Sequence, residues 1–267
     1  MSKIFVIKVG TASVLPEILS KLAPICRKLQ ENGIMPIIVS SGAVGFGKQF
    51  VNFDKLTVAR KQALASIGQP KVMQLYTRIF EKEDLIVSQL LLGCNIIQDK
   101  QQYDNARNSI FELLSMGVIP IINENDAVVV QELNFGDNDR LSAFIAEMVD
   151  AASLIILTDV DGLYTEHPSN PDAVLIPVVE SFSDLKMDDL GATGSKSSTG
   201  GMLTKIIAAE YATAANIDTW IVHAQHTGRI LDILLGRAVI ATNFVAQPNP
   251  SFNNFEFMDQ QMIINFQ

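Results

Sequence analysis

The sequence has few cysteines and no long apolar run, and each scarcity excludes a class of protein. Cys26 and Cys94 are the two cysteines among 267 residues, and they lie in apolar segments without the spacing of metal ligands. We therefore expect buried, reduced thiols, as in a reducing cytoplasm. No uncharged stretch approaches the roughly 18–20 apolar residues of a membrane-spanning helix. Because the first residues also lack a secretory signal pattern, we expect a soluble, cytoplasmic protein.

Positive charge is scarce as well. The chain has 20 Lys and Arg against 29 Asp and Glu, which gives a net charge of -9. This balance argues against a nucleic-acid scaffold and against a basic membrane-surface protein, so neither kind of partner is expected. An anionic ligand would have to be met by a local group of cations. Apolar residues make up 48% of the chain, which is ample for a continuous core.

Short β-branched runs alternate with segments of helical spacing. The expected strands are residues 4–7, 37–39, 86–92, 118–122, 154–157 and 220–222. The alternation predicts right-handed crossovers and an α/β fold, with an open, mostly parallel sheet sandwiched by helices. In such sheets ligands bind beyond the carboxyl ends of the strands, so the polar segments that follow the strands are the candidate site.

Two common nucleotide-binding motifs are absent. No Gly-x-Gly-x-x-Gly follows an expected strand, which gives a dinucleotide-dependent oxidoreductase little support. The nearest approach to a Walker motif, residues 191–197, has the wrong spacing between glycine and lysine. A phosphate site in this chain would therefore need another design.

Two lysines stand where such a site could form. Lys8 ends the first expected strand and is followed by Gly10, which would let backbone amides approach an anion. A lysine at a strand end is, taken alone, most often a solvated charge. The second lysine, Lys205, follows a glycine pair and lies in the first turns of an expected helix, whose start can accept an anion. The pair indicates a phosphoryl-transfer site without a P-loop.

Residues 136–139, Gly-Asp-Asn-Asp, place carboxylates at the start of another expected helix. One of Asp137, Asn138 and Asp139 is expected to be the helix N-cap, but three such residues exceed that need. A carboxylate between two lysines would hold both ammonium groups and help to orient a magnesium-bound nucleotide. Asp139 suits this role.

Six blocks in this order resemble the amino acid kinase family, and within it the glutamate 5-kinases. The blocks are residues 8–11, 41–43, 122–128, 136–139, 157–164 and 199–205. The resemblance extends from residue 3 to residue 246, and the Asn-Glu-Asn-Asp-Ala block distinguishes glutamate 5-kinases from relatives that act on aspartate, acetylglutamate, carbamate or UMP. It implies a carbamate kinase-like fold and ATP-dependent phosphorylation of the γ-carboxylate of glutamate, the first step of proline synthesis.

The resemblance also implies a role for each matching residue. Lys8, Lys205 and Asp139 would carry catalysis. Glutamate would be held by Ser41, Asp126 and Asn138. The ATP site would be formed by Lys8, Gly10, Thr158, Asp159, Thr199, Gly200, Gly201, Met202, Leu203, Thr204 and Lys205. Mg²⁺ would arrive on ATP, without direct protein ligands.

Domain organisation and partners are further expectations. The resemblance implies a kinase domain over residues 1–246 and a short tail over residues 247–267, without the PUA module that many members carry. It suggests a homodimer or homotetramer and inhibition by proline. The composition shifts after about residue 236, and the segment from there to residue 267 is expected to pair as an edge strand or to lie over the core. Residues 183–198 fit a lid or a solvated loop equally well.

Three other hypotheses remain open. A sister kinase could act on UMP or an isoprenoid phosphate, although Asp126 beside neutral asparagines favours an amino acid. A non-catalytic amino-acid sensor could share the fold, although both lysines and Asp139 are present. His223 and His226 are three residues apart, but no third ligand is nearby, so a metal site has little support.

Overall fold

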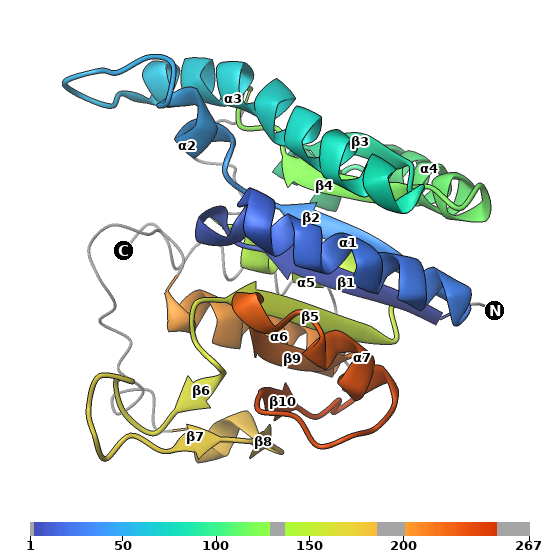
Figure 1. Cartoon of the computed structure of the whole chain (residues 1–267), viewed down its shortest axis with the longest axis vertical. Helices are drawn as coiled ribbons and strands as arrows, with labels where there is room; N and C mark the ends of the chain where they lie inside the picture. The colour runs from blue at the N-terminus through green and yellow to red at the C-terminus, as the bar shows by residue number, and fades with distance from the viewer. Residues whose placement is uncertain (1–2, 129–136, 186–200, 250–267) are drawn as a thin grey trace.

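The structure is a computed structural model, and it describes residues 3–128, 137–185 and 201–249 (Figure 1). Its main sheet has eight strands in the order β3-β4-β2-β1-β5-β9-β10-β8, and a separate pair joins β6 to β7. In the main sheet every pairing is parallel except that of β10 with β9. The strands are β1 (Lys3–Val9), β2 (Ile34–Ser40), β3 (Val87–Leu92), β4 (Ile119–Glu124), β5 (Ser153–Thr158), β6 (Leu163–Tyr164), β7 (Leu175–Ile176), β8 (Val178–Val179), β9 (Asp218–His223) and β10 (Thr242–Phe244).

Helices cover both faces of the sheet, and Figure 1 shows α1 crossing in front of β1 and β2 with α5 behind. The α-helices are α1 (Pro16–Glu31), α2 (Ala43–Gly47), α3 (Val58–Phe80), α4 (Lys100–Ser115), α5 (Asn138–Met148), α6 (Met202–Ala214) and α7 (Arg229–Leu234). The short 3-10 helices are η1 (Thr11–Ser13), η2 (Glu81–Glu83), η3 (Cys94–Ile97), η4 (Phe182–Asp184) and η5 (Ala224–His226). The predicted α/β sandwich is therefore confirmed.

The alternation of side chains along β1 divides the core into two layers. Ile4 and Val6 belong to the apolar cluster formed with α4, α5 and α6, whereas Phe5 and Ile7 belong to the cluster formed with α1, α3 and α7. Because side chains of a strand alternate between its faces, Lys8 shares the face of Ile4 and Val6. The core pattern therefore directs this lysine toward α5 and α6.

All six predicted strands are present, each within a few residues of its predicted bounds. The four further strands are two or three residues long, too short to show a period in the sequence. Thr199 and Gly200 of the predicted ATP loop, most of the predicted lid and residues 250–267 of the tail lie outside the described residues. Within the described ranges, no helix has the length and apolar character to cross a membrane.

Helices α2 and α3 approach each other unusually closely at two glycines. A Cβ atom on Gly68 would lie 1.8 Å from the carbonyl oxygen of Ala43, and one on Gly47 would lie 2.0 Å from that of Leu64. Such distances leave no room for a side chain, so glycine is required at both positions. The contact holds α3 beside the segment that follows β2, and it places Gln69 next to the carboxyl ends of the strands.

Candidate active site

Three elements bring two lysines to one carboxylate. Lys8 comes from β1, Asp139 from the first turn of α5 and Lys205 from the first turn of α6. The Nζ atom of Lys8 lies 2.6 Å from Oδ1 of Asp139, and the Nζ atom of Lys205 lies 3.2 Å from Oδ2. The structure thus brings together the three residues predicted for catalysis. We call them the lysine–carboxylate centre.

The lysine–carboxylate centre is largely sealed from solvent. Asp139 is fully buried, and each lysine is 6% exposed. The hydroxyl of Thr204 donates a 2.8 Å hydrogen bond to Oδ2 of Asp139. Burial acts to raise the pKa of Asp139, but the two ammonium groups and this hydrogen bond outweigh it and hold the pKa below its ordinary value. Two cations and one ionised carboxylate leave a net positive charge that suits an anionic ligand such as a phosphate.

Asp137 is the N-cap of α5, in agreement with the expectation that one of the three polar residues has this role. Its Oδ1 atom accepts backbone hydrogen bonds from Asp139 at 2.9 Å and Arg140 at 3.0 Å. Burial and the nearby charge of Asp139 raise the pKa of Asp137 to about 6, although the hydrogen bond and charge of Arg140 oppose the shift. The cap therefore stabilises the first turn of α5, which carries Asp139.

Asn138 faces the ends of the neighbouring strands. Its Nδ2 atom donates to the carbonyl oxygen of Ser40 at 2.6 Å, to Oγ of Ser41 at 2.9 Å and to Oδ1 of Asn123 at 2.7 Å. Two of the predicted glutamate-binding residues, Ser41 and Asn138, are therefore in direct contact. Since Asn138 adjoins Asp139 in sequence, these contacts also tie the start of α5 to β2 and β4.

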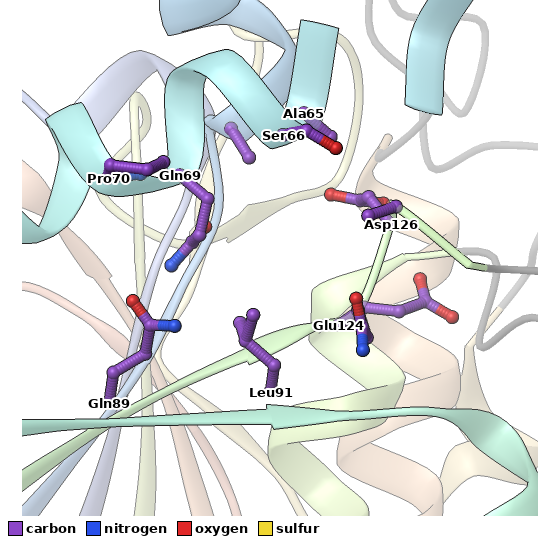
Figure 2. Close-up of a pocket in the computed structure, with 11 residues that line it drawn as sticks. Ala65, Ser66, Gln69, Pro70, Gln89, Leu91, Glu124 and Asp126 are labelled. Atoms are coloured by element: carbon purple, nitrogen blue, oxygen red, sulfur yellow. The ribbon is translucent and has the colours of Figure 1, made fainter. Parts of the chain in front are cut away.

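A pocket of about 180 Å³ adjoins this contact, and we call it the acceptor pocket (Figure 2). Its volume suits a small metabolite rather than a whole nucleotide. The residues that line it are Ala43, Ala65, Ser66, Gln69, Pro70, Gln89, Leu91, Glu124, Asn125, Asp126 and Ala127. Figure 2 shows Gln69 and Asp126 on opposite sides of the pocket. Burial raises the pKa of the Asp126 carboxyl.

The predicted ATP-binding residues within the described ranges lie at the ends of β1 and β5 and at the start of α6. A Cβ atom built on Gly10 would lie 3.5 Å from Nζ of Lys8, so the Gly10 backbone borders the lysine. Thr158 ends β5, and its hydroxyl donates a 3.1 Å hydrogen bond to Oδ1 of the exposed Asp159.

The helix that carries Lys205 also contributes to the predicted ATP site. Gly201 is the N-cap residue of α6, and Met202 and Leu203 follow in its first turn, with Leu203 41% exposed. The carbonyl oxygen of Gly201 accepts a 2.9 Å hydrogen bond from the Thr204 hydroxyl. These residues form an open surface beside the positive centre, as a nucleotide phosphate chain would require.

Sequence reasoning missed three polar residues of the site. Asn123 and Glu124 were recognised only as part of a motif, and Gln69 was not singled out at all. Gln69 lies on α3, 54 residues before Asn123, and is 7% exposed. The flanking Gly68 and Pro70 were the features of the sequence that could have drawn attention to Gln69. The sequence around a buried glutamine does not differ in a regular way from that around an exposed one.

The histidines have a local structural role. His223 is the N-cap residue of η5, and its Nδ1 atom accepts a 3.1 Å hydrogen bond from the backbone of Gln225. The His223 and His226 rings lie 5.3 Å apart, at the end of β9.

Comparisons with known proteins agree with this geometry. The sequence profile of the amino acid kinase family matches residues 3–223 of the chain. The chain belongs to the amino acid kinase family.

Among proteins of known activity, the chain is similar to glutamate 5-kinases. It is 39% identical over 258 residues to the glutamate 5-kinase of Haemophilus influenzae, with 91% of this chain and 69% of that protein covered. It is 41% identical over 261 residues to that of Cyanothece sp., with 94% and 71% covered.

A solved structure confirms the fold at low sequence identity. The chain resembles carbamate kinase from Giardia lamblia with a TM-score of 0.67 and 17% identity, over 92% of this chain and all of that one. At this identity the likeness shows the fold alone. The predicted carbamate kinase-like architecture is therefore confirmed.

Proposed function

We propose that this chain is a glutamate 5-kinase, which transfers the γ-phosphoryl group of ATP to the γ-carboxylate of L-glutamate as the first step of proline synthesis. One observation carries the proposal: a buried carboxylate fixes two lysines, and hydrogen-bonded amides connect the start of its helix to a small pocket with acidic and amide residues in its lining. The similarity to glutamate 5-kinases over more than nine-tenths of the chain supports it.

The proposed chemistry needs no dedicated base. A glutamate carboxylate, with an ordinary pKa of about 4.3, is already ionised at neutral pH and can act as the nucleophile. One of its oxygens would attack the γ-phosphorus of ATP while the bond from that phosphorus to the bridging oxygen breaks and ADP leaves. The product would be γ-glutamyl phosphate, an acyl phosphate.

The main barrier is the approach of one anion to another. Lys8 and Lys205 would stabilise the negative charge on the phosphoryl oxygens and on the leaving ADP. Asp139 would act through the lysines: it holds both ammonium groups in place before substrates bind, so little reorganisation is needed during the reaction. This preorganisation is the form of electrostatic catalysis that enzymes use most effectively.

Mg²⁺ belongs to the proposal as a partner of ATP. The two oxygens of Asp139 are engaged by Lys8, Lys205 and Thr204, which fits an ion held by phosphate oxygens and water rather than by this carboxylate. When bound, the ion would neutralise further charge on the phosphates.

The acceptor pocket favours an amino acid. The Asp126 carboxylate on its wall suits an ammonium group and disfavours a phosphorylated acceptor such as UMP. The Asp126 carboxylate would pair with the α-ammonium of glutamate, and Ser41 and Asn138 would lie between that ammonium and the lysine–carboxylate centre.

Turnover with ATP and Mg²⁺ in the presence of hydroxylamine tests the proposal, because hydroxylamine traps acyl phosphates as hydroxamates. Glutamate, aspartate, acetylglutamate and UMP are compared as acceptors. We expect hydroxamate with glutamate alone, and its loss in Lys205→Ala. Turnover of UMP instead would indicate a sister kinase, and glutamate binding without turnover would indicate a sensor.

Three finer features remain predictions from the resemblance. Inhibition by proline is tested by titrating proline at subsaturating glutamate, where an unchanged rate would contradict it. Assembly into a dimer or tetramer is tested by light scattering, which a monomer mass would contradict. A cytoplasmic location is tested by fractionation of cells that produce the chain.

A further inference from the structure

A chain of three side-chain amides connects the start of α5 to the acceptor pocket. Nδ2 of Asn138 donates to Oδ1 of Asn123 at 2.7 Å, and Nδ2 of Asn123 donates to Oε1 of Gln69 at 2.9 Å. All three side chains are at least half-buried, and Asn123 and Gln69 are 1% and 7% exposed. The chain thus reaches from the residue beside Asp139 to the lining of the pocket.

Backbone groups fix the direction of every amide in this chain. The carbonyl oxygen of Ser40 can only accept, so the Asn138 atom 2.6 Å from it must be the nitrogen. The backbone N–H of Glu124 can only donate, so the Asn123 atom 2.9 Å from it must be the oxygen. The Asn123 nitrogen then faces Gln69 and requires its oxygen there. Gln69 consequently presents Nε2, a pure donor, on its other side.

The Gln69 nitrogen is directed at the pocket. Figure 2 shows the side chain descending from α3 toward Gln89 and Leu91, across from Asp126. Among the described residues, no acceptor is recorded for Nε2. A fixed donor across a pocket from the carboxylate of Asp126 is complementary to a ligand that carries both an ammonium and a carboxylate group.

We infer that Gln69 determines acceptor specificity by donating a hydrogen bond from Nε2 to the α-carboxylate of the substrate amino acid. The inference rests on the proposed function. The ammonium group is assigned to Asp126 and the γ-carboxylate to the lysine–carboxylate centre, which leaves the α-carboxylate without a donor. Through Asn123 and Asn138, the orientation of Gln69 is also tied to the helix start that carries Asp139.

The inference is tested by changing both partners of the proposed hydrogen bond: the donor on residue 69 becomes an acceptor, and the accepting α-carboxylate of the substrate becomes a donor. Isoglutamine, the α-amide of glutamate, keeps the ammonium group and the γ-carboxylate but replaces an α-carboxylate oxygen with N–H donors. The ratio of kcat/KM for glutamate to that for isoglutamine is measured by hydroxamate formation in the parent and in Gln69→Glu. A glutamate side chain accepts at that position, so we expect the ratio to fall by about ten- to hundredfold.

Three further variants complete the experiment. Gln74→Glu makes the same change at an exposed position of α3 and is expected to keep the parent ratio. Asn123→Asp leaves Gln69 intact but removes the donor facing its oxygen; the Gln69 amide should then rotate, and the ratio should fall as in Gln69→Glu. Gln69→Met removes the donor without adding charge and replaces Gln69→Glu if that variant does not fold, as judged by its melting temperature.

The outcomes separate the two proposals. A parent that makes no hydroxamate from glutamate would overturn the proposed function and this inference with it. An active parent whose ratio is retained in folded Gln69 variants would overturn the inference alone. A ratio that falls equally in Gln74→Glu would show an effect of net charge and would also overturn it.

Discussion

The lysine–carboxylate centre and the acceptor pocket are linked through Asn138, Asn123 and Gln69 but are built by different means. In the centre, two ammonium groups from β1 and α6 share one carboxylate from α5 in a buried position, which leaves a net positive charge. At the pocket, Gln69 is oriented through two neutral amides, Asn123 and Asn138, whose directions are fixed by backbone groups. Cationic groups interact strongly with any anion and do little to distinguish one anionic ligand from another. Hydrogen-bond donors and acceptors in fixed positions distinguish between similar ligands. The comparison suggests that rate depends on the centre and acceptor choice on the pocket.

Asp139→Asn should have the largest effect, because it leaves two buried ammonium groups without a counter-charge. We expect kcat to fall by about 10³-fold and the free energy of unfolding to fall by about 3–5 kcal/mol. Hydroxamate kinetics and urea unfolding provide the measurements. Asp150→Asn is the control, since it breaks an exposed pair with Arg107 that should contribute about 0–1 kcal/mol. Equal effects of the two variants would contradict the role of the centre.

Lys205→Met should reduce rate with little effect on acceptor binding. It removes one of the two cations while Asp139 keeps its pair with Lys8, so we expect kcat to fall by about 10²–10³-fold. The KM for glutamate should stay within about threefold of the parent value, because Lys205 is expected to stabilise the transition state and not the bound glutamate. Lys100→Met, at a lysine whose side chain is 86% exposed, is the matched control. A rise in the KM for glutamate without a fall in kcat would contradict this, because it would show that the lysine–carboxylate centre acts in acceptor binding and not in rate.

Gly68→Ala should affect the acceptor pocket and spare the centre. The added methyl group would meet the Ala43 carbonyl oxygen and push α3 away from α2, at a cost of about 1–3 kcal/mol. Because Gln69 moves with α3, we expect the KM for glutamate to rise about tenfold while the KM for ATP is retained. In Gly228→Ala no atom lies within 4 Å of the new methyl group, so both constants should persist. Equal rises in the two KM values would argue against separate regions.

The smallest effect is expected from pH, at the residue between the two regions. The pKa of Asp137 is raised to about 6 from 3.8, so the folded protein holds this proton more tightly than the unfolded chain does. Stability from this group is therefore present at low pH and is lost as pH rises from about 4 to about 6. Asn caps helices as well as Asp does, so Asp137→Asn removes the charge and keeps the cap.

Urea unfolding at several pH values measures this contribution. Relative to the parent, the free energy of unfolding of Asp137→Asn should increase by on the order of 1–3 kcal/mol between pH 4 and pH 6. Asp139 does not interfere in this window, since its pKa is lowered and its contribution is lost only at more acidic pH. A difference that does not vary with pH would contradict the raised pKa.

Much of the fold and of the centre could be predicted from the sequence. The β-branched runs and the helical spacing between them identified six strands and the sandwich, because burial imposes these periods on the chain itself. Lys8 was identifiable because it follows an apolar strand, and Asp139 and Lys205 because each stands in a glycine-containing block at the start of an expected helix. The blocks indicated a function through their combined resemblance to a family, and the Asn-Glu-Asn-Asp-Ala block indicated the acceptor within that family.

Only the tertiary structure decided how the acceptor pocket is lined. Gln69 and Asn138 are far apart in the chain, and their coupling through Asn123 depends on the crossover of β4 between β2 and β3 and on the close contact of α2 with α3. The sequence by itself determined which elements form and where charge accumulates, because propensity and periodicity are local. The direction of each buried amide was decided by groups that the fold brings next to it, and the local sequence does not indicate which groups these are.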